Sequence, residues 1–390
     1  MITLEDAWAR LFALARPPGP ETIAVDEAAG RYLAADLIAR RTRPAADLSA
    51  MDGFAVAGAG PWRVIGESRA GVPFAGSLAG GEATRISTGA ACPEETEGIV
   101  LIEDGALAGE ELRAPPPEPG RWIRRAGFDF AAGDVLIEKG TRIGPAQLGL
   151  ARAAGHGSVV VARRPRLAVL ECGDELADDP EAIPPDGLPA SNGAMLAAMA
   201  RDLAEVRRIG PLPDDRDGLA RAFAQTGDAD VLVTIGGASV GEHDHIRGAL
   251  EDCGATLAFW RVAIRPGKPL LVAGRGEQIV LGLPGNPNSS FVTAWLFVLP
   301  LLRAVQGAAS PLPAALPLAL AAPVPAGGQR REFLRARLAG GRAEPLPERD
   351  SSALRTLAAA DLLIDRPIGA PPHGAGEVVD CYWLGNGGIA

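Results

Sequence analysis

The clearest pattern of apolar and polar positions lies between residues 164 and 306. Short, β-branched apolar runs alternate there with amphipathic segments. The runs predicted as strands cover residues 167–170, 206–209, 231–235, 257–262, 270–273 and 279–283, and the segments predicted as helices cover residues 191–203 and 217–225. Apolar runs of this length are typical of strands buried on both faces of a sheet. Their alternation with helices predicts a doubly wound, mostly parallel sheet.

The pattern before this α/β segment is different. Residues 3–15 show an amphipathic helical pattern that opens with a capping box, and residues 22–39 carry a short strand and a helical run. From about residue 54 to 119, short alternating runs are separated by Gly and Pro, which predicts a small β domain. Residues 144–154 have a helical pattern again.

The pattern after the parallel-sheet strands has two parts. The apolar run 291–302 is predicted to be a core helix, because it is shorter than a bilayer-spanning helix and contains Pro300. Short strands and many turn residues follow Gly307, which predicts a second β domain. The predicted fold class is therefore α/β plus β.

A glycine-rich loop, Gly236-Gly-Ala-Ser-Val-Gly241, directly follows the predicted strand 231–235. A strand, a glycine loop and a helix start present backbone N–H groups to a phosphate or another oxyanion. The loop fits neither G-x-G-x-x-G nor the lysine-bearing P-loop. It does match G-x-S-x-G, so a serine hydrolase using Ser239 with His243, His245 or His373 is a rival hypothesis. A tight turn without a ligand is the third interpretation.

Composition and charge limit the classes of function that are open to this protein. The 390 residues have a net charge of −10, with 47% hydrophobic and 22% charged residues, which describes a soluble globular protein of more than one domain. The charge argues against nucleic acid as the main partner. An anionic substrate then needs a local basic cluster. The four cysteines are far apart in sequence, which suits the cytoplasm, and we expect neither a signal peptide nor a membrane span.

Five motifs fall where predicted strands of the α/β segment end. They are residues 172–176, 213–215, 236–241, 265–269 and 283–289. Ligands of open α/β sheets bind at such ends. Arg265 and Lys268 flank a Pro-Gly turn and suit a compact oxyanion. The carboxylates are hard oxygen ligands, which hold Mg²⁺ beside a phosphate. They are Asp174, Glu175, Asp215 and Asp244.

Read in order, six motifs resemble the MoeA / gephyrin E-domain family, the molybdopterin molybdenumtransferases. They are Met51-Asp-Gly-Phe-Ala-Val56, Arg85-Ile-Ser-Thr-Gly-Ala90, Gly173-Asp-Glu-Leu176, Gly236-Gly-Ala-Ser-Val-Gly-Glu242, Pro266-Gly-Lys-Pro269 and Leu283-Pro-Gly-Asn-Pro287. The resemblance covers nearly the whole chain. It implies insertion of molybdate into adenylylated molybdopterin with release of AMP, assisted by a divalent cation, expected to be Mg²⁺.

The resemblance also implies an elongated homodimer whose sites are shared between subunits. Residues 1–40 and 120–163 would form a discontinuous N-terminal domain, with the β domain of residues 41–119 inserted in it. Residues 164–306 would form the molybdopterin-binding α/β domain and residues 307–390 a β-barrel. The upstream adenylyltransferase and the recipient molybdoenzymes are the implied protein partners, with no role for nucleic acid or a membrane.

The family's site residues can be placed on this chain motif by motif. The implied catalytic residues are Asp52, Thr88, Asp129, Glu175 and Asp244, of which the first three would reach the partner subunit's site. The implied pterin-nucleotide residues are Gly173, Asp174, Asn192, Asp215, Gly236, Gly237, Ser239, Gly241, Lys268, Pro284, Gly285, Asn286, Pro287 and Ser289. Arg265, Lys268, Arg330 and Ser351 would hold molybdate, and Glu175 and Asp244 the metal.

Several positions depart from the family pattern. Cys172 stands where Thr is usual, Phe128 replaces an acidic residue, Ala190 an Asp and Asn288 an apolar residue. Arg265 replaces a lysine, which keeps the charge but changes the hydrogen-bond geometry. These departures raise the hypothesis of a divergent paralogue that is tuned to another substrate or that only binds molybdopterin as a scaffold.

Overall fold

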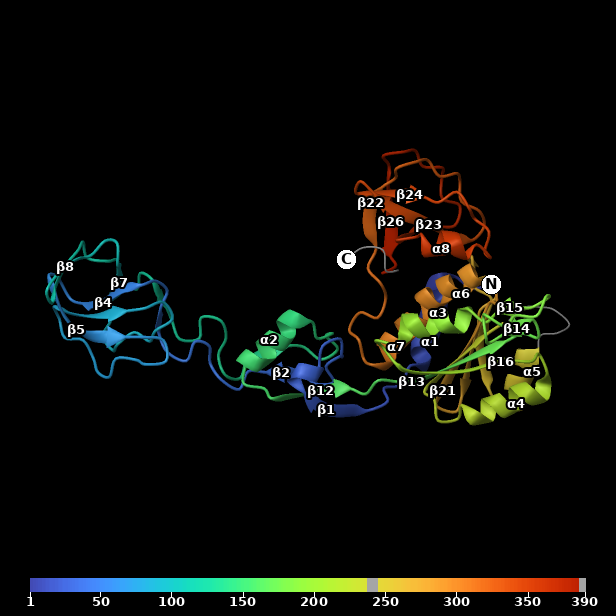
Figure 1. The fold of residues 1–390 in the computed structure, drawn as a ribbon, viewed down its shortest axis with the longest axis horizontal. Helices are drawn as coiled ribbons and strands as arrows, with labels where there is room; N and C mark the ends of the chain where they lie inside the picture. The colour runs from blue at the N-terminus through green and yellow to red at the C-terminus, as the bar shows by residue number, and fades with distance from the viewer. Residues whose placement is uncertain (237–244, 386–390) are drawn as a thin grey trace.

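The computed structural model of the protein describes residues 1–236 and 245–385. The molecule is elongated, with a small β domain at one end and the α/β region at the other (Figure 1). The helices are α1 (Leu4–Leu14), α2 (Pro145–Ala153), α3 (Asn192–Ala200), α4 (Arg216–Gln225), α5 (His245–Asp252), α6 (Pro287–Thr293), α7 (Leu299–Val305) and α8 (Leu354–Ala358). A 3₁₀ turn covers Val25–Glu27, and a π-helical segment, Ala294–Val298, joins α6 to α7.

A six-stranded sheet forms the centre of the α/β region. Its order is β16 (Glu205–Leu212), β13 (Arg166–Cys172), β17 (Val231–Ile235), β21 (Gln278–Leu283), β20 (Leu271–Arg275) and β18 (Thr256–Trp260). The first four strands are parallel, β20 runs antiparallel to β21, and β18 runs antiparallel to β20. The prediction of a mostly parallel sheet is confirmed.

Alternate residues of the sheet pack into two separate cores, which is why its strands are apolar throughout. Leu167 and Val169 of β13 belong to the core under α1, α3, α6 and α7. Ala168 and Leu170 of the same strand belong to the core under α4 and α5. Helices thus cover both faces of the sheet, as the doubly wound prediction requires (Figure 1).

The core helix is longer than the apolar run 291–302 from which it was predicted. It is continuous from Pro287 to Val305 and is long and apolar enough, by length and composition, to cross a membrane. Of its most apolar stretch, 89% is buried inside the protein. Trp8 of α1 donates its indole N–H to the Leu296 carbonyl at 2.8 Å, so the first helix packs directly on it. The prediction of a core helix holds.

The small β domain contains one sheet of six strands. Their order is β7 (Gly98–Leu101), β4 (Gly53–Ala57), β6 (Glu82–Ile86), β5 (Trp62–Ser68), β9 (Glu111–Arg113) and β8 (Ala106–Ala108). Phe54 and Val56 of β4 pack on one face, and Ala55 and Ala57 pack on the other. Because both faces have their own core, β4 is buried along its whole length.

The segments before and after this β domain pair with each other. The antiparallel pairs are β1 (Pro20–Ala24) with β12 (Ser158–Ala162), β2 (Leu37–Ile38) with β11 (Val135–Ile137), and β3 (Leu48–Ser49) with β10 (Ile123–Arg124). The helical run predicted within residues 22–39 is wrong. The only helical turn there is the 3₁₀ turn, which ends at Glu27, and Gly30, at φ +80°, prevents a right-handed helix from continuing beyond it.

The C-terminal region is rich in strands, as predicted. Its sheet has the order β19 (Ile264–Arg265), β23 (Arg331–Ala339), β25 (Leu362–Arg366), β26 (Val378–Trp383) and β22 (Leu316–Ala319), and β24 (Arg342–Pro345) also pairs with β23. A short pair, β14 (Leu176–Ala177) with β15 (Leu188–Pro189), follows the end of β13. Because β19 belongs to the α/β segment, its parallel pairing with β23 joins the two regions beside the candidate site. The domain limits given above remain a prediction.

Candidate functional site

Two adjoining pockets lie where the central parallel strands end. The strand-end pocket has a volume of about 620 Å³, and the residues at the ends of β13, β17 and β21 line it. The lining includes Glu171, Cys172, Glu175, Ser191, Asn192, Asp214, Gly236, Pro284, Gly285, Asn286, Pro287, Ser352 and Leu354. This is the position at which open α/β sheets bind ligands.

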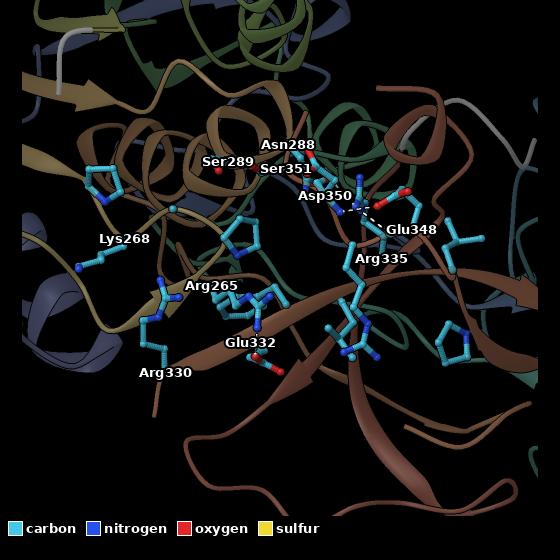
Figure 2. Close-up of a pocket in the computed structure, with 18 residues that line it drawn as sticks. Arg265, Lys268, Asn288, Ser289, Arg330, Glu332, Arg335, Glu348, Asp350 and Ser351 are labelled. Carbon is cyan, nitrogen blue, oxygen red and sulfur yellow. Dashed lines mark hydrogen bonds and ion pairs between the residues drawn. The ribbon is translucent and has the colours of Figure 1, made fainter. Parts of the chain in front are cut away.

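The second pocket, here called the basic pocket, has a volume of about 570 Å³. It lies between the turn of residues 265–269, the start of α6, strand β23 and the loop that follows β24 (Figure 2). Its charged and polar lining residues are Arg265, Lys268, Asn288, Ser289, Arg330, Glu332, Arg335, Glu348, Arg349, Asp350 and Ser351. Pro269 lines both pockets, which shows that they are neighbours.

The turn that carries Arg265 and Lys268 requires glycine at its centre. Gly267 has φ +102°, and a Cβ placed on it would lie 2.4 Å from Cγ2 of Thr293. Because Thr293 is fully buried on α6, the turn packs directly on that helix. The positions of both cations are therefore set by a close backbone contact.

The cations of the basic pocket are not equivalent. Arg265 forms an ion pair with Glu332 at 3.0 Å, and Glu332 is only 8% exposed. Arg330 donates to the Ile264 carbonyl at 3.3 Å. Among residues 1–236 and 245–385, no carboxylate lies within ion-pair distance of Lys268 or Arg330. These two side chains are thus available to neutralise a bound oxyanion, and Figure 2 shows them on the same side of the pocket as Arg265.

Acidic side chains dominate the strand-end pocket. Glu171 accepts hydrogen bonds from the backbone N–H groups of Asn192, at 3.0 Å, and Gly193, at 2.8 Å, at the start of α3. Burial raises the pKa of Glu171, although both hydrogen bonds and nearby Arg208 act to lower it. Glu175 and Asp214 add two further carboxylates to the lining. In the part of the chain that the structure describes, no three potential ligands are close enough to hold a metal ion.

Cys172 lies in the strand-end pocket but is 4% exposed. Burial is the main cause that raises its pKa to about 12, and the nearby carboxylates Asp214 and Glu171 raise it further. A thiol with this pKa is protonated at neutral pH and is a poor nucleophile. Cys172 therefore lines the pocket without offering reactive chemistry.

The structure brings most of the predicted site residues together. The strand-end pocket contains Glu175, Asn192, Gly236, Pro284, Gly285, Asn286 and Pro287, and the basic pocket contains Arg265, Lys268, Ser289, Arg330 and Ser351. Neither lining includes Gly173, Asp174 or Asp215. Asp174 accepts from the backbone of Asp214 at 3.0 Å, and Asp215 caps α4 by accepting from Gly218 at 2.6 Å. The predicted residues Gly237, Ser239, Gly241 and Asp244 lie outside the described residues.

Three predicted catalytic residues lie on the far part of the chain. Asp52 accepts hydrogen bonds from the backbone and the hydroxyl of Thr88, at 2.6 and 3.0 Å, and these bonds lower the pKa of Asp52. Asp129 pairs with Arg43 at 3.4 Å. The sheet that carries Asp52 and Thr88 at the ends of β4 and β6 is separated from the central sheet by the α2 region (Figure 1). Within one chain the three residues do not line either pocket.

The rival hydrolase hypothesis gains no support from His373. This residue lies in the C-terminal region, where its Nδ1 contacts the guanidinium of buried Arg366. It lines neither pocket. Ser239, His243 and the side chain of His245 lie outside the described residues.

Some lining residues were not foreseen from the sequence, above all Glu171, Glu332, Arg335 and Asp350. A signal exists for Glu171, because it is the one acidic residue in the apolar strand Arg166–Cys172. Glu332 and Arg335 belong to a strand with charged residues at many positions, and no pattern distinguishes those that face the pocket. Asp350 lies in a polar loop, where acidic residues are common.

Comparison with known proteins places the chain in a family. Residues 2–155 match the MoeA N-terminal region (domains I and II), residues 168–304 a probable molybdopterin binding domain, and residues 317–384 the MoeA C-terminal region (domain IV). The chain is 36% identical to the molybdopterin molybdenumtransferase of Haemophilus influenzae, over 79% of this chain and 78% of that protein. It is 31% identical to molybdopterin molybdenumtransferase 1 of Mycobacterium tuberculosis over the full length of both chains.

Solved structures agree with the sequence comparison. A crystal structure of a MoeA protein from Pyrococcus horikoshii matches with a TM-score of 0.82 at 29% identity, covering 98% of this chain and 99% of that one. A second structure from that organism has a TM-score of 0.87 at 23% identity, covers 98% of this chain and 100% of that one, and supports the fold alone. On its sequence and its fold, this chain belongs to the MoeA family.

Proposed function

We propose that this protein is a molybdopterin molybdenumtransferase, which inserts molybdate into adenylylated molybdopterin and releases AMP. The observation that carries the proposal is the contact between the two pockets. A cation-lined pocket of about 570 Å³ opens beside a larger pocket at the strand ends, and Pro269 lines both. The reaction needs such a pair, because a small dianion must be held next to a pterin nucleotide.

The basic pocket is the proposed molybdate site. Lys268 and Arg330 carry positive charges without a carboxylate partner in the described residues, and Arg265 adds a third charge that Glu332 partly neutralises. Ser351 offers a hydroxyl at the opposite side of the pocket (Figure 2). Converging charged and hydrogen-bonding groups of this kind bind tetrahedral oxyanions.

The strand-end pocket is the proposed site for the pterin nucleotide. The backbone of Gly236 and of residues 284–287 forms its floor, and Asn192 is fixed there by donating its amide to the Gly285 carbonyl at 2.7 Å. Glu175, with Asp244 outside the described residues, supplies oxygen ligands suited to Mg²⁺. When bound, Mg²⁺ would neutralise charge on the phosphates.

The proposed reaction consists of two balanced exchanges. Water attacks the adenylyl phosphorus, the bridging P–O bond breaks, and AMP and molybdopterin result. Both dithiol sulfurs bond to molybdenum, and one oxygen of molybdate leaves as water with the two thiol protons, so molybdenum stays at oxidation state +6. Neither exchange needs a strong protein nucleophile, which agrees with the protonated thiol of Cys172.

The remaining catalytic residues are proposed to come from a second copy of the chain. Asp52, Thr88 and Asp129 lie on the distant arm of the molecule and line neither pocket of their own chain (Figure 1). In a homodimer they would reach the partner subunit's pockets, where the aspartates serve proton transfer or the metal and Thr88 donates a hydrogen bond. We place this reaction in the cytoplasm, between the adenylyltransferase that supplies the nucleotide and the molybdoenzymes that receive the cofactor.

An insertion assay with two matched variants tests the proposal. The chain has two lysines, Lys139 on the exposed surface and Lys268 in the basic pocket. With adenylylated molybdopterin, Mg²⁺ and molybdate, the wild type should release AMP and form active cofactor. Lys268→Met should raise the KM for molybdate by about 10- to 100-fold, because one charged contact is lost. Lys139→Met should behave as the wild type.

A binding or scaffold role is the second candidate. It is favoured by Phe128, whose side chain is 75% exposed directly beside Asp129, at a position where the family usually has an acid. If the wild type binds the nucleotide but yields neither AMP nor cofactor, the scaffold role replaces the insertase. If it binds neither nucleotide nor molybdate, both candidates fail.

A further inference from the structure

Two chain segments separate the basic pocket from the strand-end pocket, and we call them the shared wall. One is residues 286–289, at the start of α6, and the other is residues 348–354 of the C-terminal region. In each segment some residues line the basic pocket and the others line the strand-end pocket. The wall is therefore a structural part of both sites.

The two segments of the wall are joined by hydrogen bonds across the domain boundary. The side-chain amide of Asn286 donates to the Ser351 hydroxyl at 3.1 Å. The backbone N–H of Asn288 donates to the Ser351 carbonyl at 3.0 Å. Both bonds end on one residue of the 348–354 loop, so the position of this loop decides whether the wall is closed.

Arg335 of β23 holds that loop from the opposite side. Its Nη1 donates to the Ala353 carbonyl at 3.0 Å, and its Nη2 donates to the carbonyls of Glu348 and Asp350 at 2.8 and 2.9 Å (Figure 2). Arg335 is 4% exposed. A planar guanidinium can bond three carbonyls at fixed directions, which the flexible ammonium of lysine does less well.

The partners of Arg335 are unusual for a buried charge. Among the residues that the structure describes, no carboxylate lies within ion-pair distance of it. Burial is the main cause that lowers its pKa, although the nearby carboxylates of Glu348 and Asp350 act to raise it. Its hydrogen bonds end on backbone carbonyls of the loop. Because burial of a charge is costly unless hydrogen bonds compensate it, the loop carbonyls and Arg335 depend on each other.

We propose that Arg335 is a positioning residue for both pockets, because it holds the 348–354 loop in place against Asn286 and Asn288 and so keeps the shared wall closed. Without it, Ser351 loses its position in the basic pocket, and Ser352 and Leu354 lose theirs in the strand-end pocket. The inference rests on the proposed function for the identity of the two ligands. A residue that contacts only the oxyanion would affect one pocket, whereas Arg335 affects two.

The test measures both affinities separately by calorimetry, with molybdate and with adenylylated molybdopterin, on the intact protein. Arg335→Met should weaken both by about tenfold or more, since several hydrogen bonds to a charged group are lost. Lys268→Met should weaken molybdate binding far more than nucleotide binding. Arg337→Met is the matched control, because Arg337 lies on the same strand, is exposed and forms an ion pair with Glu344 at 3.5 Å outside the pocket linings. It should change neither affinity.

Each outcome decides the matter. If Arg335→Met weakens binding in one pocket only, or in neither, the positioning role is wrong. If this variant does not fold, Arg335→Lys serves instead. Lysine keeps the charge but cannot bond all three loop carbonyls at once, so both affinities should fall by less than tenfold. Equal affinities for Arg335→Lys and the wild type would overturn the inference. Failure of the wild type to bind either ligand would count against the proposed function rather than against Arg335.

Discussion

Gly267→Ala is the substitution whose effect can be worked out most directly from the structure. The added Cβ would lie 2.4 Å from Cγ2 of Thr293 and 3.3 Å from Cδ1 of Ile264, and both neighbours are fully buried. The backbone at φ +102° is also unfavourable for alanine. Two separate costs therefore act on one turn, which is the turn that carries Arg265 and Lys268.

The two costs have different sizes. A left-handed conformation costs an L-residue about 1–2 kcal/mol. Forcing a methyl group into a packed site costs about 1–3 kcal/mol more, because neighbours must shift. We therefore expect Gly267→Ala to lower the free energy of unfolding by about 2–5 kcal/mol. A turn that moves to relieve the contact would displace Lys268 and weaken molybdate binding as well.

A matched control separates the two costs. Gly276 lies in the turn between β20 and β21 at φ +60°, and a Cβ there would meet nothing within 4 Å. Gly276→Ala should therefore cost only the backbone part. Urea unfolding gives a midpoint for each variant. The shift in midpoint, multiplied by a common slope, gives the difference in free energy of unfolding. If Gly267→Ala costs no more than Gly276→Ala, the close contact with Thr293 does not exist and the reasoning fails.

A second substitution tests the contact itself. Thr293→Ser removes Cγ2, the atom that the new methyl group would strike. It keeps the hydroxyl that donates to the carbonyls of Ser289 at 2.7 Å and Ser290 at 3.1 Å. In the double variant the packing cost should largely disappear, giving a coupling energy of about 1–3 kcal/mol. Additive effects would show that the two side chains do not meet.

Three further predictions concern single groups. Cys172, with its pKa raised to about 12, should resist iodoacetamide at pH 8 until the protein is unfolded, as read by peptide mass spectrometry. Glu332→Gln should tighten molybdate binding about 3- to 10-fold in calorimetry, most clearly at low salt, because Arg265 loses its competing carboxylate. The folded-state pKa of Asp52 is depressed below 3.8 by its bonds to Thr88, so its stabilising effect is present above pH 3.8 and is lost as the pH falls further. Thermal melts should therefore separate wild type from Asp52→Asn at neutral pH and converge in acid.

The central fold could be predicted because its strands are buried on both faces. The apolar run at residues 231–235 coincides with β17, and α4 begins one residue before the predicted helix. Burial on two faces leaves a continuous signal in the sequence. The segment 22–39 has no such signal, since it is held by pairing with residues about a hundred or more positions away, and its predicted helical run does not form.

The site could be predicted where local sequence fixes it. The Pro-Gly turn marks Lys268 in the sequence, and the strand ends mark Gly236 and the 284–287 segment. Tertiary packing determines the ion pair of Arg265 with Glu332 and the contacts of Arg335 with its loop. No local sequence pattern could therefore predict them. Ser351 was reached only through the resemblance to a family, because its position depends on contacts between domains.

The charges of the two pockets bear on how the proposed reaction works. The protein has a net charge of −10, yet Lys268 and Arg330 concentrate positive charge in the basic pocket. Pro269 lines both this pocket and the strand-end pocket, with its carboxylates. The described lining of the strand-end pocket contains carboxylates and no lysine or arginine. Phosphates bound there need positive charge from outside that lining, and the adjoining basic pocket is one source of it in the same chain. Electrostatics thus gives a reason for the two pockets to share one wall: the cations that we propose hold molybdate would also act on a nucleotide in the neighbouring pocket.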